Sequence, residues 1–303
     1  MSDTILVSVC CLAYNHSRYI RKCLDGILEQ KTQFEYEIII NDDASTDDTA
    51  DIIKEYEALY PTIIKPIYQT KNQFSQGTNM LDLVFSHASG KYIAICECDD
   101  YWTDNLKLQK QVDLLERDES YGCVYTRYIT VDVECAEIDF PPSKQHQARS
   151  FSGDIFSTLL YGNFPQTLTV LFRADLLSLS LEDPLGVDYS LFLKLALQTK
   201  FYFLPDVTGA YRINPAGLIQ SGNFFKYDIK GLVTYYYCQY LKHREFRRPF
   251  INNMKIHVAF LRNLCFYSNF KRNPLAFKLI VKHCWLIAFL IPLFFIKNGI
   301  RLE

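Results

Sequence analysis

Several signatures of common protein classes are absent from the sequence. It contains no GxSxG or Walker-type phosphate loop, no internal repeat, and no metal-ligand spacing among its six histidines. Its ten cysteines include no CxxC pair, and several lie in apolar runs where cysteine packs as a small hydrophobic side chain. These features indicate a reduced, cytosolic compartment, and residues 1–4 lack the basic segment and apolar run of a signal peptide.

The sequence also has little excess charge. The net charge is -2 at pH 7, whereas nucleic-acid binding requires a basic face, so we expect no nucleic acid among the partners. Basic residues become more frequent in the C-terminal third, which favours a surface that faces a membrane. The uncharged run at 284–296 is too short to span a bilayer as a straight helix. We expect it to lie at the inner membrane face, the alternative being a helix packed on the main domain or on a second subunit of a homo-oligomer.

Apolar residues, in contrast, are abundant enough for a sizeable core. They make up 49% of 303 residues, which suffices for one large α/β domain and a smaller appendage. At the start of the chain, apolar runs typical of buried strands alternate with segments of helical spacing. The predicted strands are residues 5–13, 36–40, 63–68 and 92–96, and the predicted helices are residues 17–30, 45–60, 79–88 and 105–117. This order predicts a mostly parallel, doubly wound sheet, in which ligands bind beyond the carboxyl ends of the strands.

The rest of the chain is less regular. The polar stretch 130–150 is typical of a variable loop or insertion, and Ser45 and Asp48 have the spacing of a capping box. Further predicted elements are helices at 152–160 and 187–197 and strands at 168–172, 201–204 and 207–211. Two apolar stripes of helical spacing follow, one formed by Ile229, Leu232, Val233, Tyr236, Tyr240 and Leu241, the other by Ile251, Met254, Val258, Leu261 and Cys265. We therefore expect an α/β domain over 1–217 and a helical region over 218–303.

Two acids follow the fourth predicted strand. Glu97 and Asp99 are two residues apart, so in extended chain their side chains point to the same side. Two hard oxygen ligands side by side suit Mg²⁺ or Mn²⁺, which would also take diphosphate oxygens. The alternative is a polar turn that leads into the next helix.

Other polar residues also fall at strand ends. Tyr14 and Asn15 follow the first strand, where they would stack on and hydrogen-bond a nucleobase, or simply form a loop. Asp43 follows the second strand, where it would face the N–H edge of a base or cap the next helix. Arg212 ends the last predicted strand and would either clamp a diphosphate or form a surface ion pair.

Asp188 opens the helix predicted at 187–197. By helical spacing it shares a face with Phe192 and Leu195, which are inward-facing positions. Partial burial raises the pKa of a carboxyl group and suits it to act as a general base. The alternative is a simple N-cap aspartate.

Taken together, these pieces resemble the family-2 inverting glycosyltransferases, which have the GT-A fold. The resemblance extends from about residue 7 to residue 217. It is carried by AYNH at 13–16, EIIINDDASTD at 37–47, GKYIA at 90–94, ECDDYW at 97–102, GVDY at 186–189 and YR at 211–212.

The resemblance implies an activity and a role for each site residue. The activity is metal-assisted transfer of a sugar from a nucleotide-diphosphate donor, expected to be a UDP-sugar, to a hydroxyl of a saccharide or lipid-linked acceptor in bacterial surface-polysaccharide synthesis. The resemblance implies that Tyr14 and Asp43 contact the base. It implies that Asp99 is the principal ligand of Mn²⁺ or Mg²⁺, with Glu97 beside it. It also implies that Asp100 lies near the donor sugar, that Arg212 contacts the diphosphate and that Asp188 is the general base.

Some positions depart from the family pattern. Glu97 replaces the usual first Asp of the DxD motif, and Val187 and Asn214 stand where relatives often carry an acid and a histidine. The Arg-x-x-Arg-Trp motif of processive synthases is missing, which favours single-sugar transfer over polymer synthesis. Two other functions stay open. A nucleotidyltransferase would usually have a Gly-rich loop near residues 13–16, and a catalytically silent module would bind sugar or membrane without turnover.

Overall fold

The chain divides into two units. The computed structural model describes residues 4–179, 188–214, 229–242, 255–256 and 259. One unit lies within 1–155 and 163–228, and the other within 156–162 and 229–303. The domain boundary predicted at residue 217 lies outside the described residues and stays a prediction.

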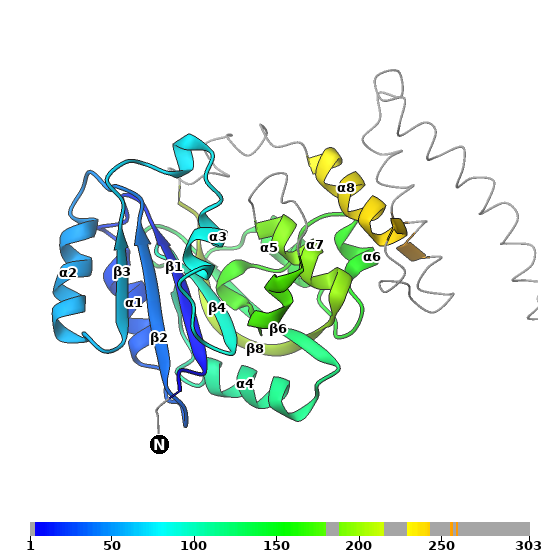
Figure 1. Ribbon diagram of the computed structural model, residues 1–303, viewed down its shortest axis with the longest axis horizontal. Helices are drawn as coiled ribbons and strands as arrows, with labels where there is room; N and C mark the ends of the chain where they lie inside the picture. Colours follow the sequence, from blue (N-terminus) through cyan, green and yellow to red (C-terminus); the bar gives the residue numbers. More distant parts are fainter. Residues whose placement is uncertain (1–3, 180–187, 215–228, 243–254, 257–258, 260–303) are drawn as a thin grey trace, which may run out of the picture. The chain divides into compact units, whose positions relative to one another are not determined.

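The first unit is built on a mixed sheet with the strand order β3-β2-β1-β4-β7-β6-β8-β5 (Figure 1). Its described strands are β1 (Val7–Ala13), β2 (Tyr36–Asp42), β3 (Ile64–Tyr68), β4 (Tyr92–Glu97), β5 (Tyr101–Trp102), β6 (Tyr121–Val131), β7 (Leu171–Arg173) and β8 (Lys200–Arg212). Its described helices are α1 (Ile20–Leu28), α2 (Thr49–Leu59), α3 (Met80–Phe85), α4 (Lys107–Arg117), α5 (Pro141–Gln147), α7 (Asp188–Gln198) and the 3₁₀ turns η1 (Phe74–Gln76), η2 (Thr167–Thr169) and η3 (Ala174–Ser178).

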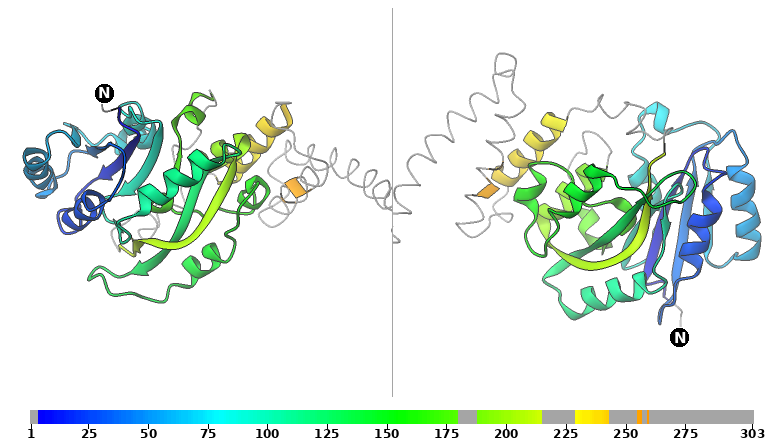
Figure 2. Two further views of the ribbon diagram at one scale, coloured as in Figure 1. Left: turned by 90° about the horizontal axis from the view of Figure 1, so that it is seen from below. Right: turned by 180° about the vertical axis from the view of Figure 1, so that it is seen from behind.

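The parallel half of the sheet agrees with the prediction. β1 pairs in parallel with β2 and β4, and β2 pairs in parallel with β3. Helices lie on both sides of the sheet (Figure 2), which is why the central strands are buried almost throughout. Parallel strands end at the same edge, so the residues after β1, β2 and β4 are brought together.

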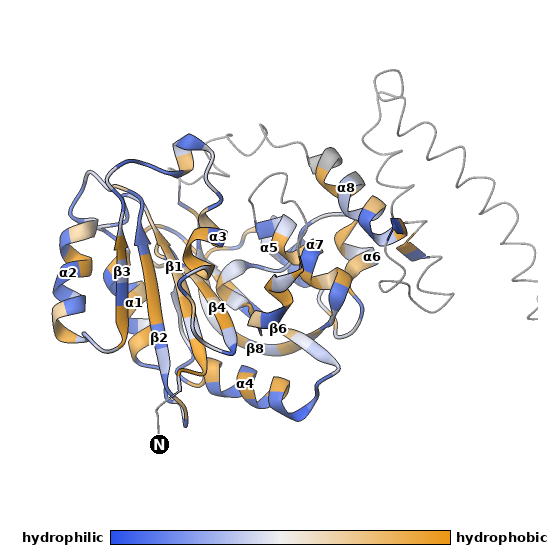
Figure 3. Cartoon of the chain, in the orientation of Figure 1, coloured by the Kyte–Doolittle hydropathy of each residue, from blue (hydrophilic) through white to orange (hydrophobic). Residues whose placement is uncertain are grey.

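The core explains why these segments fold as they do. Val7, Val9 and Cys11 share one face of β1 by strand alternation, and they pack with buried residues of α1, α2 and α4. On α1 the buried positions Ile20, Cys23, Leu24 and Ile27 have the predicted helical spacing. Figure 3 shows the central strands largely hydrophobic, whereas α2 and α4 carry both kinds of residue, as expected of helices with one face on the sheet.

The other half of the sheet is more complex than predicted. β7 runs antiparallel to both β4 and β6, and β5 runs antiparallel to β8. The two short strands predicted at 201–204 and 207–211 are one strand, β8, which pairs in parallel with β6 through several register shifts. Two of these register shifts lie on either side of Arg127.

Two local predictions were wrong. The stretch 130–150 is not simply a loop, because β6 extends to Val131 and α5 covers Pro141–Gln147. Paired prolines suggest a loop, but proline fits the first turn of a helix, whose N–H groups have no helical acceptor. The predicted capping box also does not form, since the Ser45 hydroxyl accepts from the Asn15 N–H at 2.9 Å and no side chain caps α2 at Asp48.

The second unit contains α6 (Phe156–Leu159) and α8 (Ile229–Lys242) among its described residues. The rings of Phe156 and Tyr240 lie 5.7 Å apart, and Leu232, Val233 and Tyr236 of the first predicted stripe are buried, so the helix at this position is confirmed. The stripe around 251–265 falls almost entirely outside the described residues, as does the apolar run at 284–296. Among the helices described, none combines the length and hydropathy needed to span a bilayer.

Candidate active site

An acidic turn closes the carboxyl end of β4. The strand ends at Glu97, and the Asp100 N–H donates to the Glu97 carbonyl at 2.9 Å, which turns the chain through Cys98 and Asp99. The Cys98 N–H donates to the carbonyl of Leu12 at 3.0 Å and so ties the turn to β1. The turn therefore lies at the edge of the sheet where β1 and β2 also end.

Glu97 is strongly affected by its surroundings. Its carboxylate accepts a hydrogen bond from the Thr167 hydroxyl of η2 at 2.7 Å. Burial, followed by the charges of Asp99 and Asp188, raises the pKa of Glu97 to about 7, while the Thr167 hydrogen bond opposes the shift. Asp188 is thus within electrostatic reach of the end of β4, although the two residues lie on different elements.

Asp188 is the first residue of α7, as the sequence predicted for the helix. Its Oδ2 accepts a hydrogen bond from the Asn163 side-chain amide at 3.0 Å. Burial raises the pKa of Asp188, and hydrogen bonds from the Tyr189 N–H and from Asn163 oppose the shift. A half-buried carboxylate held by an amide is suited to accept a proton from a bound hydroxyl.

Tyr211 on β8 links these acids into one cluster. Burial raises the pKa of its phenol, and so do the charges of four carboxylates, those of Asp100, Glu97, Asp99 and Asp188. A single side chain lies within electrostatic range of all four. The structure therefore brings together the acids of the β4 turn and the predicted base, which we call the acidic cluster.

Asp99 is partly open to solvent, with 21% of its side chain exposed. Its Oδ2 lies 4.0 Å from His16 Nε2 and 3.4 Å from the side-chain amide nitrogen of Asn214. His16 Nδ1 is buried without a hydrogen-bond partner among the described residues. The sequence predicted no role for His16, and its position directly after the strand-end residues Tyr14 and Asn15 is the signal that could have indicated one.

The donor set of the acidic cluster fits a hard divalent cation. Glu97 and Asp99 offer carboxylate oxygens, which are the ligands that Mg²⁺ and Mn²⁺ prefer. Burial raises the pKa of both Glu97 and Asp100, and the charge of Asp99 raises both further, while Arg212 opposes the shift of Asp100. A bound cation would relieve this repulsion.

Arg212 holds the acidic turn in place from β8. It is 3% exposed, and its guanidinium lies 4.6 Å from the ring centre of Tyr19. Its Nε donates to the Asp99 carbonyl at 2.7 Å, its Nη1 donates to the Asp132 carbonyl at 2.9 Å, and its N–H donates to Asp100 Oδ1 at 2.7 Å. The surface ion pair that the sequence also allowed is therefore not formed, whereas contact with a diphosphate stays a prediction.

The residues predicted to hold a base lie at the ends of β1 and β2. Tyr14 is 45% exposed. Asn15 adopts a φ of 55° and its Oδ1 accepts from the Thr46 N–H at 2.8 Å, which joins the two loops. Asp43 is buried, and its carboxylate accepts from the N–H groups of Gln73 and Phe74 at 2.6 and 3.1 Å. Asn15 and Asp43 therefore shape the loops that present the exposed Tyr14 ring.

Replacing Arg212 with methionine is expected to destabilise the fold by about 3 kcal/mol or more, because the substitution leaves the backbone carbonyls of Asp99 and Asp132 without their donors and removes the positive charge beside buried Asp100. The matched control is Arg127→Met, since Arg127 is exposed on β6 and its loss should change stability by less than about 0.5 kcal/mol. Chemical denaturation of both variants checks this. Equal stability of the two variants would show that the Arg212 contacts contribute little.

Glu97→Gln is expected to change how stability depends on pH. A folded pKa of about 7 against the ordinary 4.5 means that the folded state binds the proton more tightly, so wild-type stability falls as pH rises from about 4.5 to about 7. At about 1.4 kcal/mol per pKa unit, ionised Glu97 costs about 3 kcal/mol. Without divalent cations, the variant should exceed the wild type by up to that amount at pH 8 and match it at pH 4.

The control for this experiment is Glu116→Gln. Hydrogen bonds from Lys91 and Tyr92 lower the pKa of Glu116, so this change should reduce stability at pH 8 instead of increasing it. Denaturation curves at both pH values, recorded with a chelator, make the comparison. The account of Glu97 fails if its glutamine variant tracks the wild type at every pH.

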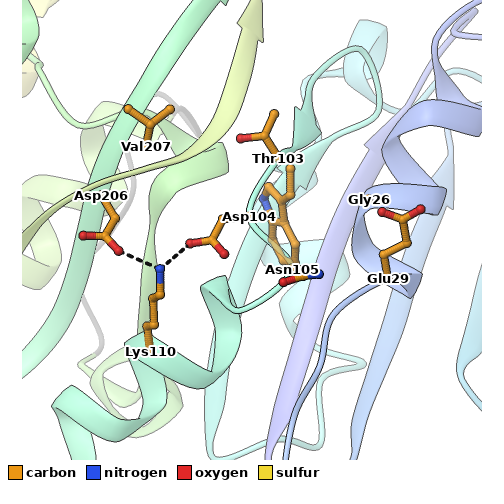
Figure 4. A pocket seen from close by; sticks show the side chains of 9 residues that line it. Gly26, Glu29, Thr103, Asp104, Asn105, Lys110, Asp206 and Val207 are labelled. Carbon is orange, nitrogen blue, oxygen red and sulfur yellow. Dashed lines mark hydrogen bonds and ion pairs between the residues drawn. The ribbon is translucent and has the colours of Figure 1, made fainter.

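A hollow of about 520 Å³ is lined by other residues than those of the acidic cluster (Figure 4). In it, Lys110 Nζ bridges the carboxylates of Asp104 and Asp206 at 2.7 and 2.6 Å. Its walls also include Glu29, which follows α1, and Trp102. None of the predicted site residues lines this hollow.

Comparisons with known proteins bear on the site. The family model described as Glycosyl transferase family 2 matches residues 8–153. An uncharacterized protein of Mycobacterium tuberculosis is 38% identical over 220 residues, which are 71% of this chain and 61% of that protein. The chain thus spans less than two thirds of this relative's length.

Two further proteins carry informative names. The Escherichia coli protein named UDP-Glc:alpha-D-GlcNAc-diphosphoundecaprenol beta-1,3-glucosyltransferase WfaP is 30% identical over 192 residues, covering 63% of this chain and 70% of that protein. The structure of S. aureus TarS 1–349 in complex with UDP-GlcNAc superposes with a TM-score of 0.64 at 17% identity, covering 88% of this chain and 74% of that chain. At that identity the likeness shows a shared fold.

Proposed function

The chain belongs to glycosyltransferase family 2, and we propose that it transfers one sugar from a nucleoside diphosphate donor to an acceptor hydroxyl, with inversion at the anomeric carbon. The observation that carries this proposal is the acidic cluster, in which four carboxylates, from the end of β4, the turn after it and the start of α7, lie within electrostatic range of Tyr211. UDP is the expected nucleotide, because the E. coli relative is named for a UDP-glucose donor and TarS was solved with UDP-GlcNAc.

Asp188 is the proposed general base. Its carboxylate accepts the proton of the acceptor hydroxyl as the hydroxyl oxygen attacks the anomeric carbon. The bond from that carbon to the diphosphate oxygen breaks, and the nucleoside diphosphate leaves with the electron pair. Because attack is opposite the leaving group, the configuration inverts. The Asn163 amide, 3.0 Å from Asp188 Oδ2, orients the carboxylate for this proton transfer.

Asp99 is the proposed principal ligand of Mn²⁺ or Mg²⁺, with Glu97 beside it. A divalent cation, when bound there, neutralises charge on the departing diphosphate. Glu97 must be ionised to contribute, and its raised pKa near 7 means that proton release accompanies binding. Thr167 supports the ionised form through its 2.7 Å hydrogen bond.

The remaining site residues are proposed to position the donor. Tyr14 stacks on the base from its exposed position, and Asn15 and Asp43 fix the loops around it, with Asp43 facing the N–H edge of the base. Asp100 lies beside the donor sugar. Arg212 fixes the acidic turn through the Asp99 carbonyl and approaches the diphosphate from that side.

The acceptor is proposed to be a saccharide on a lipid carrier. This rests on the name of the E. coli relative, which specifies a diphosphoundecaprenol-linked acceptor. Such an acceptor places the enzyme at the inner face of the cell membrane, where the segment 284–296 would make peripheral contact. In a homo-oligomer, each copy of the chain would contribute one such segment to this contact.

The test is a product assay with UDP-sugars and Mn²⁺, with and without saccharide or lipid-linked acceptors. When the acceptor is present, sugar transfer releases UDP in proportion to the sugar incorporated into the acceptor. Release of pyrophosphate would instead indicate nucleotidyl transfer. No release from any nucleotide sugar, with or without acceptor, would favour a silent binding module.

A further inference from the structure

We propose that a soft, thiophilic metal ion binds a cluster of buried thiols beneath the acidic turn. The sulfur atoms of Cys11, Cys23 and Cys98 all lie within 4.8 Å of one another, and we call these three residues the thiol cluster. Cys96 adds a further sulfur 3.7 Å from that of Cys23. All four residues are buried, and none has a part in the proposed sugar transfer.

The fold brings these thiols together from three segments. Cys11 on β1 and Cys96 on β4 are register partners in neighbouring parallel strands, so their side chains share one face of the sheet. Cys98 follows Cys96 by two residues, just beyond the end of the strand. Cys23 lies on α1, which covers this face, and its sulfur is 3.7 Å from the Glu97 carbonyl.

The chemistry of the thiol cluster differs from that of the acidic cluster. Zinc–thiolate bonds of about 2.3 Å place tetrahedral sulfur ligands about 3.8 Å apart, so the three sulfurs need to approach by no more than about 1 Å. Thiolates select soft ions such as Zn²⁺ or Cu⁺, whereas Glu97 and Asp99 select hard ones. Each thiol that coordinates releases its proton to solvent.

Cys98 lies between the two proposed ligands of the hard cation. A soft ion held by Cys98 would therefore restrain the backbone between Glu97 and Asp99. Among the described residues, the thiol cluster is the one group of three or more histidine, cysteine or acidic side chains whose ligand atoms all lie this close together. The competing explanation is that the cysteines only pack as small hydrophobic side chains.

Titration of the reduced, metal-free, full-length protein with Cd²⁺ separates these explanations. Thiolate ligation gives a charge-transfer absorption in the ultraviolet, whereas Cd²⁺ on the carboxylates of the acidic cluster gives none. Because the thiols are fully buried, absorbance is read after prolonged incubation. The wild type should saturate with one thiolate-bound ion per chain.

The matched variants are Cys11→Ala and Cys10→Ala. Cys10 is the neighbouring residue on β1 and equally buried, but it points to the opposite face and leaves the thiol cluster intact. Cys11→Ala should lose most of the band, and Cys10→Ala should keep it. Cys23→Ala on α1 should show the same loss as Cys11→Ala and serves if the latter fails to fold by circular dichroism.

Two results would overturn the proposal. One is a wild-type titration without a saturating thiolate band. The other is an equal band in folded Cys10→Ala and Cys23→Ala protein, which would assign the ion to other cysteines. Because the readout is absorbance and not turnover, either result leaves the proposed sugar transfer untouched.

Discussion

Asp188→Asn is expected to lower turnover by about 10²–10⁴-fold, because a general base typically contributes that factor. The substitution keeps the size of the side chain and the α7 helix start but removes the carboxylate that accepts the proton. Donor binding should survive, since the predicted contacts to nucleotide and cation come from β1, β2 and the β4 turn. The effect should therefore appear in kcat and not in the affinity for the donor.

The measurement is steady-state transfer, combined with calorimetric binding of UDP in the presence of Mn²⁺. Asp51→Asn is the control, since Asp51 is an exposed residue on α2 and far in sequence from the acidic cluster. It should retain wild-type turnover. Wild-type kcat in a correctly folded Asp188→Asn variant would remove Asp188 from the mechanism.

Asp99→Ala is expected to abolish the metal-dependent part of donor binding. Loss of a hydrogen-bond partner behind a metal ligand typically costs roughly 10–100-fold in metal affinity, so loss of the ligand itself should cost more than about 100-fold. Asp99 is the partly exposed acid of the turn, and the side chains of His16 and Asn214 beside it are not acids. Its carboxylate is thus available to a cation.

Titration of UDP into the protein with and without Mn²⁺ gives the two affinities for wild type and variant. The wild type should bind more tightly with the ion, and Asp99→Ala should bind equally weakly in both conditions. Asp113→Ala on α4 is the control, because Asp113 pairs only with Gln109 on the same helix among the hydrogen bonds described. An Asp99→Ala variant with full Mn²⁺-dependent affinity would place the cation elsewhere.

The sequence predicted the parallel half of the fold well, for a physical reason. Strands buried on both faces, such as β1, appear as continuous apolar runs, and helices such as α1 show their apolar stripe directly. The GT-A fold class is confirmed by the superposition on TarS with a TM-score of 0.64. β6 was not predicted as a strand, because it carries Thr126, Arg127 and Thr130 and pairs irregularly with β8. The directions of β5 and β7 depend on tertiary packing that no local pattern records.

The residues of the candidate site also fall into those that the sequence could predict and those that it could not. Glu97, Asp99 and Asp188 could be proposed from strand ends and a helix start, since acids there face the ligand edge of a parallel sheet. Thr167 and Asn163 could not, because their significance depends on partners 70 and 25 residues away. Arg212 was also proposed from the sequence, but its hydrogen bonds to backbone carbonyls follow from the path of β8 and not from sequence spacing.

A crystal structure of the protein with UDP and Mn²⁺ tests the central claim most directly. The account predicts the ion bonded to an Asp99 oxygen and to diphosphate oxygens at about 2.1 Å, with the base against Tyr14 and the Asp188 carboxylate open toward the position of the anomeric carbon. An ion or nucleotide bound away from the β4 turn, for example in the hollow beside Lys110, would contradict it.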